Sequence, residues 1–239
     1  MKYFYMMKHD LKIKQIEQKI YYSCVPACLE QVLSHYKIKV NQKEILATLK
    51  MPKRGMSIPA AGSYLIKSGL NPLTITNNIN IFDCGWIKLE NVSLIEKLIK
   101  RKKYLDAYNK SLVDDYLQYL RAGGEIGFQI LSANLIGKFL SKNIPIIAEL
   151  ASNILYGKSK STEAGAFDDP IKGDIDGHAV VIADFNKAKG KFKIIDPDSR
   201  KNTFSKRGIY WIDSDLLLAS IFNLDGKSIL IVNRKTIKN

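Results

Sequence analysis

Apolar positions follow two different patterns along the chain. In the first 142 residues they recur mostly three or four positions apart, as at Leu29, Val32 and Leu33, which is typical of helices with one buried face. From residue 143 onward they form short runs rich in valine and isoleucine, which are typical of strands. Helices are expected near residues 24–36, 42–50, 58–69, 93–103, 111–122 and 132–142, and strands near 71–76, 144–150, 178–186, 191–196, 208–212 and 228–233. The chain is therefore predicted to have an α+β fold.

Residues with known preferences for helix ends support several of these boundaries. Ser57 and Ser132 precede apolar runs and are expected to cap helices, because a serine side chain can accept a hydrogen bond from the first turn. Gly69 and Asn143 follow such runs and are expected to stop them, since both tolerate the left-handed backbone conformation. These ends separate the helices from the strands that follow.

The first helix begins at a cysteine. Ser23 is a good N-cap and Pro26 fits only the first turn of a helix, so Cys24 is expected to be the first helical residue. Unpaired backbone N–H groups and the positive end of the helix dipole favour a thiolate there. Gln18 lies six residues earlier, and its amide, with the Cys24 backbone N–H, could stabilise the oxyanion formed when a thiolate attacks an acyl carbon.

The other two cysteines are expected to have structural roles. Cys28 lies one turn after Cys24 on the same helix, where a buried thiol behaves as a small hydrophobic side chain. Cys84 has neither a helix-start signal nor a basic residue close in sequence. Only Cys24 therefore combines the features of a nucleophile.

A predicted β-hairpin supplies candidate partners for the thiol. The runs 178–186 and 191–196 are joined by a turn that contains Gly190, and their open ends carry His178 and Asp196. A slip of one residue in the pairing would turn one of these side chains to the other face, so Asp198 remains an alternative to Asp196. The hairpin predicts an imidazole and a carboxylate within reach of each other.

These segments together resemble papain-like cysteine peptidases of the C39 type, known as bacteriocin leader-processing domains, and their C39-like relatives. The resemblance rests on Gln18 to Leu29, on Arg54-Gly55-Met56-Ser57-Ile58 followed by Ser68-Gly69-Leu70, on Gly177 to Val181, and on Ile195-Asp196-Pro197. It implies a two-lobed fold, with a helical lobe over approximately residues 10–142 and an antiparallel β lobe over 143–239. It also implies Cys24 as nucleophile, His178 as base and acid, Asp196 as orienting carboxylate and Gln18 as oxyanion donor.

The sequence also departs from the pattern of that family. Val25 stands where the family commonly has glycine, and its side chain would narrow the approach to the thiol. The chain between Leu70 and Ile144 is longer than a minimal domain of this type requires. No ATPase motif or membrane-spanning segment follows, so a transporter-fused peptidase is not expected, which leaves a free-standing enzyme, a partner-delivered one or a degenerate relative.

Composition fits one globular domain over residues 1–239 in a reducing cytoplasm. The chain is 46% hydrophobic, lacks the run of about 18 apolar residues that a spanning helix needs, and begins with a segment too short for a signal peptide. Three cysteines do not make a disulfide framework. The formal charge of +14 could attract acidic peptides or nucleic acid, but no nucleic-acid-binding motif accompanies it. A solvated lysine surface is expected instead.

The sequence therefore predicts a cysteine peptidase that acts on a peptide or protein through a thioester and needs no cofactor or metal. A zinc site formed by Cys24, Cys28, His178 and Asp196 is disfavoured, because the ligands lack the usual paired spacing. Two alternatives stay open: an acyltransferase using the same three residues, and a catalytically silent peptide-binding module. The polar segment 152–177 leads directly to His178 and is either a lid over the substrate or a surface insertion. The oligomeric state is not predicted.

Overall fold

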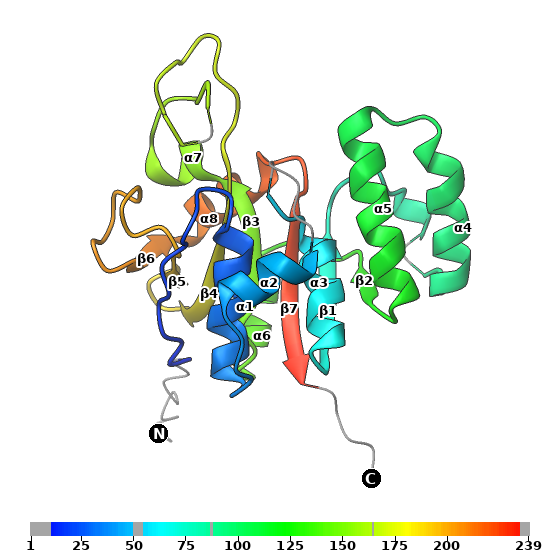
Figure 1. Ribbon diagram of the computed structural model, residues 1–239, viewed down its shortest axis with the longest axis horizontal. Coiled ribbons are helices and arrows are strands. Elements are labelled where there is room, and N and C mark those ends of the chain that lie inside the picture. Colours follow the sequence, from blue (N-terminus) through cyan, green and yellow to red (C-terminus); the bar gives the residue numbers. More distant parts are fainter. Residues whose placement is uncertain (1–10, 50–54, 87, 164, 235–239) are drawn as a thin grey trace.

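A seven-stranded sheet runs through the described part of the protein in the order β2-β1-β7-β3-β4-β5-β6 (Figure 1). The computed structural model describes residues 11–49, 55–86, 88–163 and 165–234. The strands are β1 (Leu70–Thr76), β2 (Glu125–Gly127), β3 (Ile146–Ala151), β4 (Gly177–Asn186), β5 (Lys191–Ile195), β6 (Ile209–Asp213) and β7 (Ser228–Arg234). Neighbouring strands are antiparallel, except that β1 and β2 are parallel.

Helices cover both faces of the central strands. They are α1 (Cys24–His35), α2 (Gln42–Leu49), α3 (Ile58–Lys67), α4 (Asn91–Lys102), α5 (Ala107–Arg121), α6 (Ala133–Leu140), α7 (Ser152–Tyr156) and α8 (Ser214–Phe222). Consecutive residues of β3, β4 and β7 are fully buried, and successive side chains of a strand point to opposite faces. Helix α1 packs against β4, α3 against β1, and α8 against β3. The sheet is therefore the centre of the main hydrophobic core.

All the predicted helices and strands are present, with small shifts at their ends. The side chains of Ser57 and Ser132 accept hydrogen bonds from the N–H groups of Ala60 and Leu135, which confirms both caps. Gly69 and Asn143 have φ angles of +84° and +57°, as expected of helix stops. The sequence did not predict β2, α7, α8 or the short 3-10 helix Cys84–Trp86.

The N-cap prediction for Ser23 is wrong in one respect. Ser23 precedes α1, but its side chain makes no capping hydrogen bond to that helix. Its hydroxyl instead donates to the Ile20 carbonyl at 2.8 Å and accepts from the Ile20 N–H at 3.1 Å. Ser23 therefore closes the tight turn that leads into Cys24. The first ten residues, which include His9, and Arg54 of the second motif lie outside the described residues.

The expected division into a helical and a β part is only approximate. Strands β1 and β2 come from the segment expected to be helical, and β1 pairs along its whole length with β7 near the C-terminus. One continuous sheet thus contains strands from both parts. Helices α6, α7 and α8 in turn bring helical structure to the later part.

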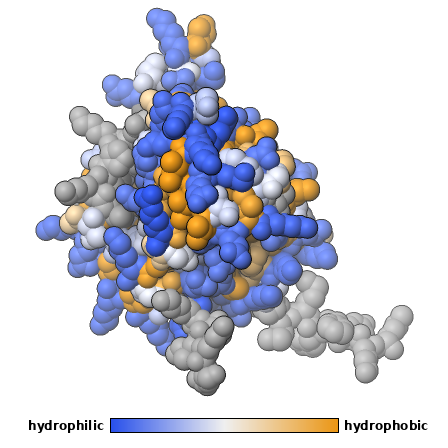
Figure 2. Space-filling model, turned by 90° about the vertical axis from the view of Figure 1, so that its right-hand side faces the viewer, coloured by the Kyte–Doolittle hydropathy of each residue, from blue (hydrophilic) through white to orange (hydrophobic). Residues whose placement is uncertain are grey.

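The long stretch between Leu70 and Ile144 forms a helical pair beside the sheet. Helices α4 and α5 pack around a second, smaller core that includes Leu98, Val113 and Tyr116 (Figure 1). On the outer side of this pair, Figure 2 shows a stripe of hydrophobic side chains between hydrophilic ones. Helix α5 also packs against α3, so the pair is fixed to the main core next to the N-terminus of α3.

Gly62 is expected to be essential for this contact between α3 and α5. A Cβ atom at Gly62 would lie 2.5 Å from Cε2 of Tyr119, a buried ring whose hydroxyl donates to the Pro72 and Glu125 carbonyls. Because the ring is anchored, Gly62→Ala should lower the free energy of unfolding by about 1–3 kcal/mol. Urea denaturation measures this change. Ser63→Ala, one residue away, serves as the control and should stay within about 0.5 kcal/mol of the wild type. Equal stability of all three proteins would show that the helices pack differently.

Candidate active site

Cys24 begins α1, as the sequence predicts, and its side chain is partly exposed. The turn before the helix is held by the Ser23 hydroxyl, and Pro26 occupies the first turn, where its missing N–H costs no hydrogen bond. The thiol therefore lies at the positive end of a twelve-residue helix.

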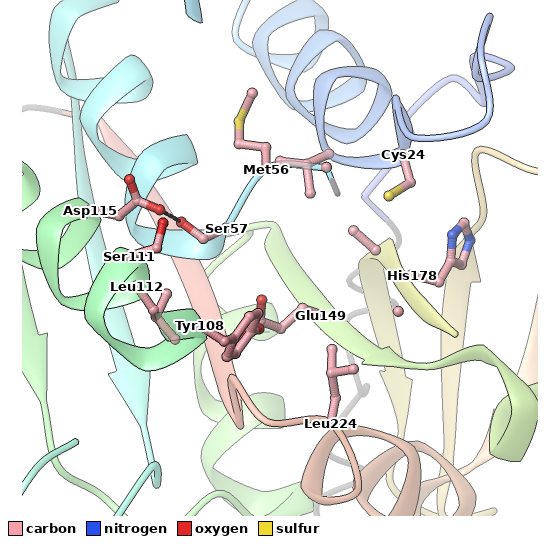
Figure 3. A pocket seen from close by; sticks show the side chains of 14 residues that line it. Cys24, Met56, Ser57, Tyr108, Ser111, Leu112, Asp115, Glu149, His178 and Leu224 are labelled. Atoms are coloured by element: carbon pink, nitrogen blue, oxygen red, sulfur yellow. Dashed lines mark hydrogen bonds between the residues drawn. The ribbon is translucent and has the colours of Figure 1, made fainter. Parts of the chain in front are cut away.

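His178 and Asp196 are in direct contact. His178 is the second residue of β4, and Asp196 directly follows β5, the next strand of the hairpin. Nε2 of His178 lies 2.9 Å from Oδ1 of Asp196, and the two residues are 9% and 0% exposed. The imidazole also interacts with Cys24, which lies next to it at one end of a groove (Figure 3). The structure thus brings Cys24, His178 and Asp196 together.

Four hydrogen bonds hold the Asp196 carboxylate. Oδ1 accepts from the Asp198 backbone N–H in addition to its contact with His178. Oδ2 accepts from the hydroxyl groups of Tyr156 and Tyr210, at 2.8 and 2.6 Å. Because both oxygens have hydrogen-bond partners, the buried Asp196 carboxylate is held in one orientation. It in turn holds the plane of the His178 imidazole. Neither tyrosine was predicted from the sequence to belong to the site.

The charges of this pair stabilise each other. Burial alone would lower the pKa of His178, but the Asp196 carboxylate and the Cys24 side chain together raise it well above its ordinary value of 6.5. Burial alone would raise the pKa of Asp196, but His178, Tyr210 and the Asp198 N–H hold it below its usual value. An imidazolium beside an aspartate is therefore favoured at neutral pH.

Gln18 and Asp198 form a second pair next to the first. Gln18 is 2% exposed, and its amide nitrogen donates to the Tyr21 carbonyl at 3.1 Å and to Oδ2 of Asp198 at 3.0 Å. Both amide protons are thus engaged, while Oε1 has no hydrogen-bond partner. Asp198 contacts Gln18 and Arg200 rather than the imidazole. The carboxylate that meets His178 is that of Asp196.

A groove of about 160 Å³, partly open to solvent, extends from Cys24 and His178 to α5 (Figure 3). Val25 lines it beside the thiol, where the family pattern commonly has glycine. The opposite wall carries Tyr108 and Asp115 of α5, and Glu149 of β3 also lines it. The helical pair that lengthens this chain therefore builds one side of the groove that leads to the thiol.

Comparison with known proteins identifies the family. Residues 10–214 match the Peptidase_C39 like family. The chain belongs to this family. Its resemblance to C39 peptidases, inferred from the motifs around Cys24 and His178, is thereby confirmed.

Two solved structures of C39-type peptidases show weak likeness to this member of the Peptidase_C39 like family. One is the peptidase domain of Streptococcus ComA, a bi-functional ABC transporter involved in a quorum sensing pathway, with 13% identity and a TM-score of 0.47 over 93% of this chain and 99% of that one. The other is a double glycine motif protease from an AMS/PCAT transporter in complex with a leader peptide, with 16% identity and a TM-score of 0.47 over 95% of this chain and 94% of that one. A comparison with curated protein sequences gave no match.

The remaining cysteines of this C39-like chain have different surroundings. Cys28 is fully buried, and its thiol contacts the Ala179 carbonyl at 3.4 Å, as expected of a core residue. Cys84 is exposed, so the expectation of a structural role for it is wrong. None of the helices in the described ranges is long and apolar enough to cross a membrane.

Two histidines of this C39-like protein, His178 and His35, have pKa values that are shifted in opposite directions. The pKa of His178 is raised mainly by Asp196, whereas burial and Arg234 lower the pKa of His35. In an NMR titration, His178 should therefore keep its proton well above the pH at which His35 loses its own. His178→Gln assigns the resonance. Because the folded protein holds this proton more tightly, the contribution of His178 to stability should decline as the pH rises above about 6.5. Loss of the proton at or below that pH would contradict the proposed ion pair.

Proposed function

We propose that the protein is a cysteine peptidase in which Cys24 is the nucleophile, His178 the base and acid, and Asp196 the orienting carboxylate. The observation that carries the proposal is the contact of His178 with Asp196 at the end of the groove where Cys24 begins α1. A thiol, an imidazole and a carboxylate in this order are the groups that cysteine peptidases use for acyl transfer to sulfur. Membership of the Peptidase_C39 like family supports the same chemistry.

The reaction would proceed in two steps. The Cys24 thiolate attacks the peptide carbonyl carbon, and the His178 imidazolium gives its proton to the leaving amine, which leaves a thioester on sulfur. A water molecule then loses a proton to His178 and attacks the thioester, which releases the acid and restores the thiol. Asp196 holds the imidazole in one orientation and stabilises its charge through both steps.

The oxyanion of each step needs hydrogen-bond donors. The backbone N–H of Cys24 is at the start of α1, where N–H groups have no partner within the helix. Gln18 would be the second donor, as the family pattern implies, but only if its amide exchanges the bond to Tyr21 or Asp198 for one to the oxyanion. We therefore assign the first role to the Cys24 N–H and propose that Gln18 joins when substrate binds.

The substrate would be a peptide or a flexible segment of a protein, because the groove is partly open to solvent and can be reached from outside. No cofactor takes part in the proposed steps. A lid role for segment 152–177 stays a prediction. The segment begins with α7, and Asp176, its last residue before β4, accepts hydrogen bonds from Tyr21 and Ser152. These bonds fix the residues immediately before β4.

Product analysis tests the proposal. The protein would be incubated with a peptide library, with and without an added primary amine, and the products identified by mass spectrometry. New carboxyl termini that appear with wild-type protein but not with Cys24→Ala would establish hydrolysis. New amides formed with the added amine would indicate an acyltransferase. Peptide retention by both proteins without any product would identify a binding module and contradict the proposal.

A further inference from the structure

Glu149 lines the same groove as the candidate nucleophile but has no part in the proposed reaction. It belongs to β3, where it pairs with Ala179, the residue after His178. Its side chain lies on the groove between Tyr108 and Leu224 (Figure 3). A carboxylate in this position would meet a side chain of any peptide that reaches Cys24 along the groove.

The carboxylate is held in place by groups that fit it closely. The Ser228 hydroxyl donates to Oε1 at 2.6 Å, and the backbone N–H of Ile58 at the start of α3 also contacts the carboxylate. A Cβ atom on Gly226 would lie 1.6 Å from Oε1, so the Glu149 carboxylate packs directly against the Gly226 backbone. This arrangement fixes Glu149 but provides no positive charge for it.

The charge of the groove contrasts with that of the whole protein. The chain has 37 lysine and arginine residues and a formal charge of +14, yet none of the described residues that line the groove is a lysine or an arginine. Asp115, on the α5 wall, is the second acid there, and the Ser57 hydroxyl donates to it. Among the described residues, none of the ion pairs includes Glu149. A buried carboxylate without a counter-ion gains most from a cation brought by a ligand.

We propose that Glu149 forms a subsite that binds a lysine or arginine side chain of the peptide substrate. The proposal rests on the proposed function, because it assumes that a peptide occupies the groove beside Cys24. The ring of Tyr108 lines the groove as well and could contact the same cation through its face. Ser228 would continue to hold one carboxylate oxygen while the other binds the substrate.

The subsite would depend on pH. Burial raises the pKa of Glu149 to about 7, although the Ser228 hydroxyl and the Ile58 N–H oppose this shift. The other titratable groups around the groove are Asp115 and Tyr108 of α5, Cys24 of α1 and His178 of β4; Tyr116, also of α5, interacts with Glu149 from the core. As the pH falls through about 7, Glu149 gains a proton and the preference for basic side chains should weaken.

Affinity selection tests the subsite without requiring turnover. Immobilised Cys24→Ala would be mixed with hexapeptides that carry Lys, Arg, Leu or Glu at one fixed position, at pH 8. Lys and Arg peptides should be retained at least about tenfold better than Leu peptides at one position, as expected of a charged hydrogen bond. Adding Glu149→Gln should remove most of this preference, while the exposed Glu96→Gln should not. The selection would also be repeated at pH 5.5 with Cys24→Ala alone, where the preference for Lys and Arg peptides should weaken. This second arm tests the subsite even if the Glu149→Gln variant does not fold.

The outcomes separate this inference from the proposed function. Equal retention of all peptides, retention of none, or a basic preference that survives both Glu149→Gln and pH 5.5 would overturn the subsite. Basic selectivity without hydrolysis by the wild-type protein would leave the subsite intact and contradict the peptidase. Hydrolysis by the wild-type protein without a preference for basic side chains would support the peptidase and contradict the subsite. Since the protein as a whole is positively charged, a preference for cations must arise locally.

Discussion

Peptide hydrolysis is expected to fall by about 10⁴-fold or more when His178 is replaced by alanine, and the reactivity of Cys24 toward iodoacetamide near neutral pH should fall with it. In the proposed pair, the His178 imidazolium would stabilise the thiolate, which is the form of a cysteine that reacts. Without the imidazole, the sulfur loses both this charge and the group that protonates the leaving amine. Rates of alkylation at several pH values, mapped by mass spectrometry, measure the first effect even before a substrate is known.

The two other cysteines serve as internal controls for this measurement. Cys28 is buried, and burial raises the pKa of its thiol well above the usual value, so it should stay unmodified in the folded protein. Cys84 is exposed and should react at the same rate in the wild type and in His178→Ala. If Cys24 reacted no faster than Cys84 near neutral pH, or kept its reactivity without His178, the proposed thiolate–imidazolium pair would be absent.

The contact between His178 and Asp196 could be predicted from the sequence because the two residues lie at the open ends of one hairpin. Two short β-branched runs joined by a glycine-containing turn bring His178 and Asp196 together through local structure alone. The register was beyond prediction, since the pairing shifts between Ile182 and Asp184 and such a bulge leaves no clear mark in the sequence. That shift is one reason why Asp196 and Asp198 could not be distinguished beforehand.

Other parts of the site depend on contacts between distant segments and could not be predicted. Tyr156 and Tyr210 meet at Asp196 from α7 and β6, and α7 is too short to show a helical period. Helix α8 was missed because Leu216, Leu217 and Leu218 are consecutive and hide the period. Glu149 lies within an apolar run that indicates only a buried strand, so its place in the groove became visible only when α5 was seen opposite it.

Gln18 shows the limit of an argument from spacing. Its distance from Cys24 in the sequence suggested an oxyanion donor, but spacing does not determine which partners an amide selects. In the structure both its protons are used, by the Tyr21 carbonyl and by Asp198. The segment from Gln18 to Cys24 therefore depends on Asp198, which lies two residues from the carboxylate that holds His178. A single turn, Asp196-Pro197-Asp198, thus supports both halves of the proposed site.

Asp196→Asn is expected to lower kcat by about 10³–10⁴-fold, because asparagine cannot both accept from His178 and stabilise its charge. The new NH₂ group would also face hydroxyl or N–H donors in place of one carboxylate oxygen, so the free energy of unfolding should fall by about 3–5 kcal/mol. The pKa of Asp196 is lowered in the folded protein, so its stabilising effect is present above the ordinary aspartate pKa, about 3.9, and is lost below it. The variant should lack this acid-dependent component.

Asp198→Asn is the matched control for that variant. Its side chain contacts Gln18 and Arg200 but not the imidazole, so hydrolysis should fall far less and alkylation of Cys24 should be unchanged. Kinetics with a substrate from the library, together with urea denaturation at pH 7 and at about pH 2.5, which is below the ordinary aspartate pKa, measure both variants. If Asp198→Asn were the more damaging substitution in hydrolysis, Asp198 would be the residue that orients the base. If both were harmless, His178 would act without a carboxylate, and the contact with Asp196 would serve only the stability of the hairpin.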